Sequence, residues 1–198
     1  MSQLHRIEVA VRPELRDSLA GRIATQLSED AGIPVRSVRT LRVFTLQGDF
    51  SSEELSRAAG KLFADPISEL SSIDVPLVGQ VLPGFDFLFE VGFRPGVTDN
   101  VGHTAAEGLC ELLGRAVGSH KVYGSLQIAI EGLEASKAEA AASCLHNALI
   151  EDCLSISSQE WSAGKRSEAR SRAVKSSHQP RVESVELPDS DEELVKLS

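Results

Sequence analysis

An internal repeat limits the possible fold more than any other feature of the sequence. Residues 8–72, moved forward by 82 positions, fall on residues 90–154 without a gap and give 14 identities in 65 pairs. The shared positions include Glu8-Val9 with Glu90-Val91, Arg12-Pro13 with Arg94-Pro95, and Asp17 with Asp99. Two copies of one small unit in a chain favour an arrangement in which the copies share a core.

The second copy opens with a strand, a turn and a helix. Phe85, Phe87, Phe89, Val91 and Phe93 alternate with polar or small residues, which predicts a strand with one buried face. Pro95 cannot donate to a sheet and Gly96 permits a positive φ, so residues 94–99 predict a turn. Asp99 is then the expected N-cap of a helix.

The same reasoning extends along both copies. In the first, we expect strands at about 6–12, 35–46 and 67–75 and helices at about 17–31 and 51–64, where Ser51 and Glu54 form a capping-box pattern. In the second, we expect strands at about 85–93, 119–130 and from 149 onward, with helices at about 99–114 and 134–147. Each unit therefore reads β-α-β-α-β.

These elements predict an α+β fold in which two tandem units form a pseudo-twofold dimer. The strands would join one largely antiparallel sheet, and helices would cover one face of it. The predicted divisions are a first unit at 1–75, a linker at 76–84, a second unit at 85–158, and a charged tail at 159–198. That tail is basic and then acidic, without a periodic apolar face, so we expect it to be flexible or to link to a following domain.

Charge and composition narrow the classes of partner. Twenty Lys and Arg against 29 Asp and Glu give a formal charge of minus nine, which argues against nucleic acid or anionic lipid as the main partner. The beginning lacks the apolar core of a signal peptide, and no apolar run reaches membrane-spanning length, so a cytoplasmic location is expected. Cys110, Cys144 and Cys153 match no zinc or redox spacing and are expected to be reduced structural thiols.

Candidate chemistry is sparse. The glycine-bearing turn at 95–102 could hold a phosphate, but Asp99 would place a negative charge there, so helix capping is the preferred interpretation. His103, His120 and His146 could pair with Cys110 or Cys144 only if the fold brought them together. The carboxylates are expected on solvent-facing surfaces. We therefore predict no catalytic, cofactor-binding or metal-binding residue.

The order of these motifs resembles the PurS family, the small subunit of phosphoribosylformylglycinamidine synthase. The resemblance is carried by the strand, the proline turn, the Asp-headed helix, and the ends of the second helices at 62–67 and 145–152, although Ala148 stands where the family usually has proline. A tandem pair is similar to the N-terminal region of fused forms of the synthase, and residues 185–194 resemble the linker that follows it there.

The resemblance implies a non-catalytic scaffold in purine biosynthesis. Such modules bridge the ATP-dependent synthetase (PurL) and the glutaminase (PurQ) and help ammonia pass between them, while the chain itself holds no cofactor. The reaction, from glutamine, ATP and formylglycinamide ribonucleotide to formylglycinamidine ribonucleotide, would belong to the partners.

Two other classes stay open. Tandem units of this kind also serve as regulatory modules that bind a small ligand between the copies, in which case residues 99–102 would be a contact. A thiol enzyme built on Cys110 or Cys144 is the third possibility.

Overall fold

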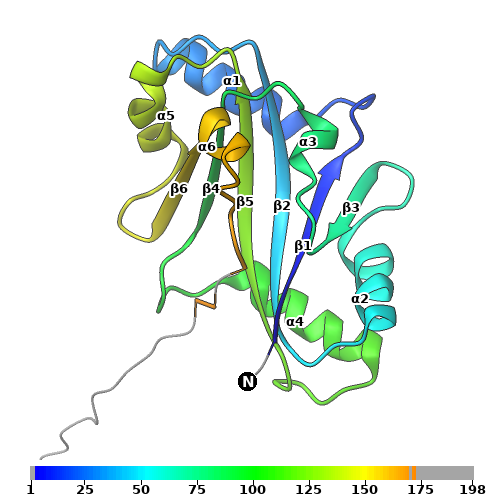
Figure 1. Ribbon diagram of the computed structural model, residues 1–198. Helices are drawn as coiled ribbons and strands as arrows, with labels where there is room; N and C mark the ends of the chain where they lie inside the picture. The colour runs from blue at the N-terminus through cyan, green and yellow to red at the C-terminus, as the bar shows by residue number, and fades with distance from the viewer. Residues whose placement is uncertain (1–2, 170, 173–198) are drawn as a thin grey trace, which may run out of the picture.

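The chain folds around one six-stranded antiparallel sheet (Figure 1). The computed structural model describes residues 3–169, 171 and 172; the predicted linker-like residues 185–194 and the rest of 173–198 lie outside this range. The strands are β1 (Gln3–Val11), β2 (Ser37–Gly48), β3 (Glu69–Ile73), β4 (Phe87–Phe93), β5 (Lys121–Glu131) and β6 (Glu151–Ser157). Their order across the sheet is β3-β1-β2-β5-β4-β6. The α+β class and the single sheet agree with the sequence-based prediction.

In the part of the chain that the structure describes, six α-helices connect or follow the strands. They are α1 (Ser18–Thr25), α2 (Ser52–Ala58), α3 (Val78–Val81), α4 (Asn100–Leu113), α5 (Ala138–Leu145) and α6 (Ser158–Ser162). Wider π-type turns extend α1 through Gln26–Asp30 and α2 through Ala59–Phe63, and a 3₁₀ turn at Ala135–Lys137 precedes α5.

Side chains close the helix ends as the sequence predicts. Asp17 and Asp99 accept backbone N–H groups at the starts of α1 and α4, and Ser51 forms a capping box with Glu54 at the start of α2. Gly114 ends α4 in the left-handed conformation, with φ of 65°. The predicted caps at Asp17, Ser51 and Asp99 are therefore confirmed.

The four longer helices lie on one face of the sheet. One core cluster packs α1 and α5 on the upper part of this face, with Ile23, Leu27 and Ala141 against Phe89 and Ile128. A second cluster packs α2 and α4 on the lower part, with Leu55, Phe63 and Leu109 against Ile7 and Val122. Helix α1 thus packs on β2 of its own half and also on strands of the C-terminal half, and α4 packs beside a helix of the N-terminal half.

The opposite face, called the open face below, is covered more thinly. We expected helices on one face only, and this is wrong, because α3 and α6 pack on the open face through Val78, Val81 and Trp161. The predicted linker at 76–84 contains α3, whose Val78 is fully buried. The apolar pairing of Phe85 with Trp161, at 5.5 Å between ring centroids, fixes α6 in place.

The two halves of the sheet have matching strand orders. In each, the first strand lies between the other two, and β2 joins β5 from Ser37 opposite Glu131 to Gln47 opposite Lys121. The 82-residue offset holds where Asp17 matches Asp99. In the central strands the offset is 84. Asp17 accepts from the backbone N–H of Thr40 in β2, and Asp99 accepts from the backbone N–H of Gly124 in β5, which lies 84 positions after Thr40. The second copy therefore has two additional residues between its first helix and its second strand, so the repeat contains a gap.

Candidate functional site

A charged cluster crosses the open face of the sheet. Arg6 on β1 donates from Nε to Oε1 of Glu8 at 2.7 Å. Its Nη1 and Nη2 donate to Oε1 and Oε2 of Glu90 on β4, at 3.1 and 2.6 Å. Because β2 and β5 lie between β1 and β4, this side chain reaches over two strands and forms a forked pair with the second carboxylate.

All three charges are removed from water. Arg6, Glu8 and Glu90 are 7%, 3% and 8% exposed. Burial acts to raise the pKa of Glu90, but the hydrogen bonds and charge of Arg6 outweigh it, so this pKa lies below its usual range. Burial likewise acts to lower the pKa of Arg6, and the two carboxylates more than compensate, so it is raised. Arg6 and Glu90 are therefore both charged at neutral pH.

Neighbouring groups occupy the remaining acceptor positions of the carboxylates. Ser125 Oγ donates to Glu90 Oε1 at 2.8 Å, and Gln127 Nε2 donates to Glu90 Oε2 at 3.1 Å. The backbone N–H of Leu77, just before α3, donates to Glu8 Oε2 at 2.7 Å. Because the pKa of Glu90 lies below its usual range, this carboxylate is a weak base, and the network of bonds connects β1, β4, β5 and the start of α3.

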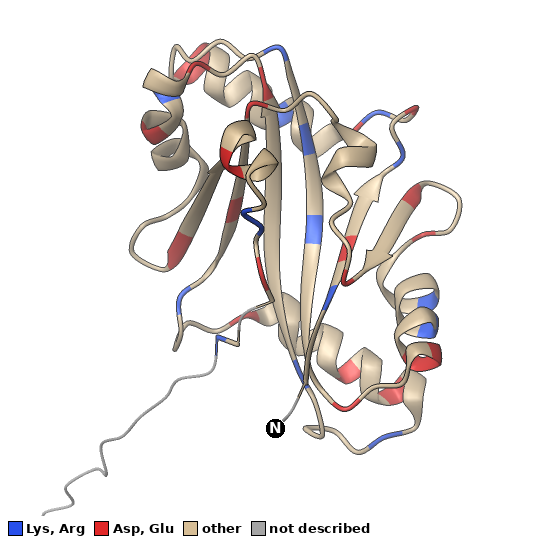
Figure 2. Ribbon diagram, viewed as in Figure 1, with Lys and Arg blue, Asp and Glu red and all other residues tan. Residues whose placement is uncertain are grey.

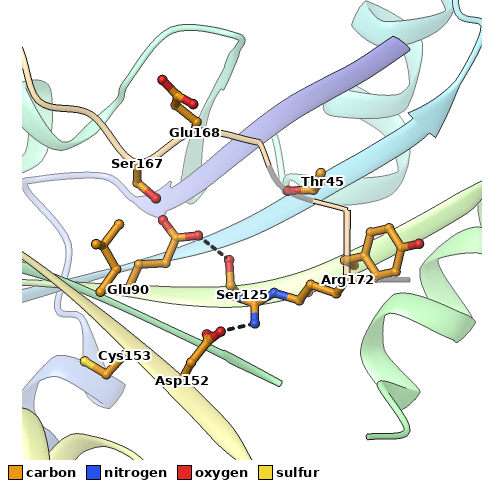
Figure 3. A pocket seen from close by; sticks show the side chains of 11 residues that line it. Thr45, Glu90, Ser125, Asp152, Cys153, Ser167, Glu168 and Arg172 are labelled. Atoms are coloured by element: carbon orange, nitrogen blue, oxygen red, sulfur yellow. Dashed lines mark hydrogen bonds and ion pairs between the residues drawn. The ribbon is translucent and has the colours of Figure 1, made fainter. Parts of the chain in front are cut away.

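A small cavity adjoins Glu90 on the open face. It measures about 120 Å³ and is lined by side chains from β2, β4, β5 and β6 and by the chain that follows α6. The polar members include Thr45, Glu90, Ser125, Asp152, Ser167 and Arg172 (Figure 3). Ser167 lies over Glu90, while Arg172 reaches Asp152. Buried Oε1 of the nearby Gln127 has no hydrogen-bond partner within the described part of the chain.

The glycine-bearing turn is used for packing and capping. Asp99 Oδ1 accepts from Gly102 N at 2.7 Å, and Oδ2 accepts from Gly124 N of β5 at 2.6 Å. A Cβ on Gly102 would lie 2.4 Å from the carbonyl oxygen of Val122. The glycine therefore allows α4 to approach β5 closely, and the Asp99 carboxylate occupies the place where a phosphate would bind.

Cys110, His103 and His146 each contact groups other than one another. Cys110 is 1% exposed and its Sγ lies 3.7 Å from Ser119 Oγ. His146 Nδ1 lies 2.6 Å from the carbonyl oxygen of Ala142, and His103 lies 3.5 Å from Glu107 on the solvent side of α4. These contacts place the candidate bases against groups other than a thiol.

Cys144 and Cys153 differ in their surroundings. Cys144 is half-buried on α5, where its carbonyl oxygen accepts from Gln26 at 3.1 Å. Burial, together with the charges of Asp152 and Glu151, raises the pKa of the Cys153 thiol to about 11. A thiol with this pKa is almost wholly protonated at neutral pH and is a poor nucleophile.

His120 supports the loop after α4. It is 8% exposed, packs on Phe50 at 4.6 Å between ring centroids, and lies 3.0 Å from Arg115 through Nε2. Burial first, and then the charge of Arg115, lowers its pKa, so the imidazole is neutral at pH 7. Arg115 also pairs with Glu54, which ties this loop to α2.

The sequence did not predict the charged cluster, because strand residues that alternate with apolar ones were expected to face solvent. That expectation is wrong for Glu8 and Glu90. One feature of the sequence does point to the cluster. Glu8 and Glu90 occupy the same position of the repeat, each on a strand whose other face is apolar.

Within residues 3–169, 171 and 172, no group of three or more His, Cys, Asp or Glu side chains is placed to hold a metal ion. In the same part of the chain, every helix is too short or too polar to cross a membrane. A scan against models of known protein families finds no match, and a search among curated proteins finds no significant match.

Proposed function

We propose that the chain is a non-catalytic scaffold module of phosphoribosylformylglycinamidine synthase, made of two PurS-like units. The observation that carries the proposal is the sheet order β3-β1-β2-β5-β4-β6, in which two three-stranded halves of the same internal order meet through β2 and β5. This is the arrangement expected of a pseudo-twofold pair built from one repeated unit.

Repeated side-chain contacts support the same proposal. In the first half, Asp65 Oδ1 accepts from the backbone N–H of Ile67, and the backbone N–H of Asp65 donates to the side chain of Glu69. In the second half, Asn147 Oδ1 accepts from the backbone N–H of Leu149, and the backbone N–H of Asn147 donates to the side chain of Glu151. These contacts recur at an offset of 82 residues. They lie at the turns that lead into the edge strands β3 and β6, where the motifs that resemble the PurS family are found.

The charged groups of the open face suit a structural role. Both buried carboxylates are bound by Arg6, and their other oxygen positions are largely filled by serine, glutamine and backbone donors. In this proposal the outer surface contacts a synthetase and a glutaminase, which perform the chemistry. The chain supports glutamine-dependent amination by holding these partners so that ammonia passes between them.

Reconstitution tests the proposal. The chain is mixed with its cognate synthetase and glutaminase, and the formation of formylglycinamidine ribonucleotide is measured with either glutamine or ammonium as nitrogen source. We expect the chain to raise the glutamine-driven rate far more than the ammonium-driven rate, because the second needs no transfer between active sites. Alone, it should neither hydrolyse ATP nor release ammonia from glutamine.

The control is the same chain unfolded by heat and added at equal concentration. A chain that leaves both rates unchanged, or that shows turnover without partners, contradicts the scaffold proposal.

The cavity beside Glu90 favours one alternative, a regulatory module that binds a small polar ligand. At about 120 Å³ it has room for only a few atoms, and it is lined by hydroxyl and carboxylate groups. Saturable binding of a small amino acid to the isolated chain, measured by calorimetry, would favour this alternative; a nucleotide is too large for this cavity.

A further inference from the structure

The open face has two unlike ends. At one end Ala10, Leu41, Leu88 and Ala129 form an apolar floor under α3 and α6. At the other end the floor is polar and includes Arg6, Thr45, Ser125 and Gly92. No helix of the described chain covers the polar end. It is covered by the segment after α6, which we call the strap: residues 163–169 with Ser171 and Arg172 (Figure 1).

The strap contains no large apolar side chain, so hydrophobic burial does not hold it. Its first charged residues contact only α6: Lys165 binds Glu160 at 2.6 Å, and Arg166 stacks on Trp161 at 3.9 Å from the ring centroid. Ser167 hydrogen-bonds Glu90 on β4. The other contacts with the sheet come from the end of the strap, where Ser171 Oγ lies 3.1 Å from Gln47 Oε1 and Arg172 binds β4 and β6. The ion pair that fastens the strap to the sheet is therefore the one made by Arg172.

Three features surround the guanidinium group of Arg172. Its Nη1 donates to the carbonyl oxygen of Phe93 and, at 2.8 Å, to Oδ1 of Asp152. Its Nη2 lies against Gly92, where a Cβ would be only 2.7 Å away. The side chain is 15% exposed, although the strap around it is largely on the surface. A planar group that donates in fixed directions fits this place, which combines a flat backbone with two acceptors.

The corresponding place in the other half lacks these features. Gly92 matches Ala10, and Asp152 matches Leu70, under the 82-residue offset. Ala10 is buried in the apolar cluster beneath α3, and Leu70 packs beside it. The space and the carboxylate that receive Arg172 are therefore particular to the second half.

Charge also favours a basic segment here. Of the 20 basic and 29 acidic residues of the chain, seven of each lie after residue 162, so residues 1–162 carry the whole formal charge of minus nine. The strap contributes Lys165, Arg166 and Arg172 against Glu168, as the blue positions along it in Figure 2 indicate. An acidic body thus faces a basic strap.

We propose that Gly92, the Phe93 carbonyl and Asp152 form a binding site for the guanidinium group of an arginine side chain. In the isolated chain its occupant is Arg172, which fastens the strap over the polar end of the open face. Loss of this side chain frees the strap and exposes the cavity beside Glu90. The empty site then accepts an arginine presented by another extended segment.

Trypsin cleavage after Lys165 and Arg166 measures release of the strap. Arg172→Met should raise the initial rate of this cleavage about tenfold, since charge-assisted hydrogen bonds of this strength correspond to roughly that change in the closed population. Arg172→Lys should give an intermediate rate, because an ammonium group cannot match both acceptors. Arg57→Met, on the exposed side of α2, is the matched control and should leave the rate unchanged.

Peptide binding tests the site itself. Full-length Arg172→Met protein is titrated with a peptide of residues 165–172 and with the same peptide ending in methionine. Only the arginine-ended peptide should bind, and Gly92→Ala added to the Arg172→Met chain should abolish its binding. Unchanged cleavage in Arg172→Met, or equal binding of both peptides, overturns the proposal. Circular dichroism verifies that each variant is folded, and none of these readouts depends on a synthetase or glutaminase.

Discussion

Replacing Arg6 by methionine tests whether the charged cluster is buried as a unit. The substitution keeps a long side chain but removes three hydrogen bonds and one positive charge. Glu8 and Glu90 would then face each other across the sheet while 3% and 8% exposed. Removing one partner of a buried ion pair typically costs about 3–5 kcal/mol, because the remaining charge is left without compensation.

That loss is large for a chain of this size. Domains are stable by about 5–15 kcal/mol, so Arg6→Met would remove a substantial share of the free energy of unfolding. At about 2–4 °C per kcal/mol for 150–250 residues, the melting temperature should fall by roughly 6–20 °C. Urea unfolding followed by circular dichroism gives the free energy, with Arg57→Met as a control that should change it by less than about 0.5 kcal/mol.

The pH dependence separates charge from packing. In the parent, the pKa of Glu90 is lowered on folding, so its contribution is present above the unfolded pKa and is lost as pH falls through the folded one. In Arg6→Met the hydrogen bonds and charge of Arg6 are gone, while burial still acts to raise the pKa of Glu90, so protonation of Glu90 at low pH relieves part of the cost. The difference between parent and variant should therefore shrink from pH 7 to about pH 4.5.

Two results would refute this reasoning. A loss below about 1 kcal/mol at pH 7 would mean that the carboxylates are solvated in solution. A loss that is the same at both pH values would mean that packing, and not charge, is responsible. Adding Glu8→Gln and Glu90→Gln to Arg6→Met should restore part of the stability, because no uncompensated charge then remains.

Other predictions concern the cap and the thiol. Asp99→Ala should lower the free energy of unfolding, measured by urea unfolding, by roughly 0.5–2 kcal/mol. The loss should lie toward the upper end of this range because Asp99 Oδ2 also accepts from Gly124 of β5. Unchanged stability together with loss of binding to a phosphate-bearing ligand would instead support the phosphate-loop interpretation. Iodoacetamide at pH 8 should alkylate Cys153 about a hundredfold more slowly in the folded chain than in urea, because its pKa is raised to about 11; equal rates by mass spectrometry would contradict this.

Much of the fold could be predicted from local sequence signals. The alternation at 85–93, the Pro-containing turns, and the caps at Asp17, Ser51 and Asp99 each depend on residues a few positions apart. Such signals are strong because the backbone groups they satisfy are neighbours in the chain. The repeat then indicated that the second half should copy the first.

Features that depend on distant packing could not be predicted in the same way. Alternation indicates which face of a strand is polar, but it does not indicate whether that face is wet or covered. The burial of Glu8 and Glu90 follows from Arg6, α3 and the strap, which come from three separate parts of the chain. The two-residue gap could not be seen in the comparison at a constant offset of 82. The identities in that comparison all lie outside β5, and the changed register concerns β5 alone.

The β2–β5 pairing has a consequence for the chain while it is being synthesised. Strand β5 begins 73 positions after β2 ends, which at about 5–20 residues per second takes a ribosome roughly 4 to 15 s. Throughout that interval β2 is an unpaired edge, and the apolar side of α1 has yet to meet Phe89 and Ile128. Exposed edges and apolar surface of this kind favour association with other chains. The N-terminal half is therefore the part that most needs protection before synthesis is complete.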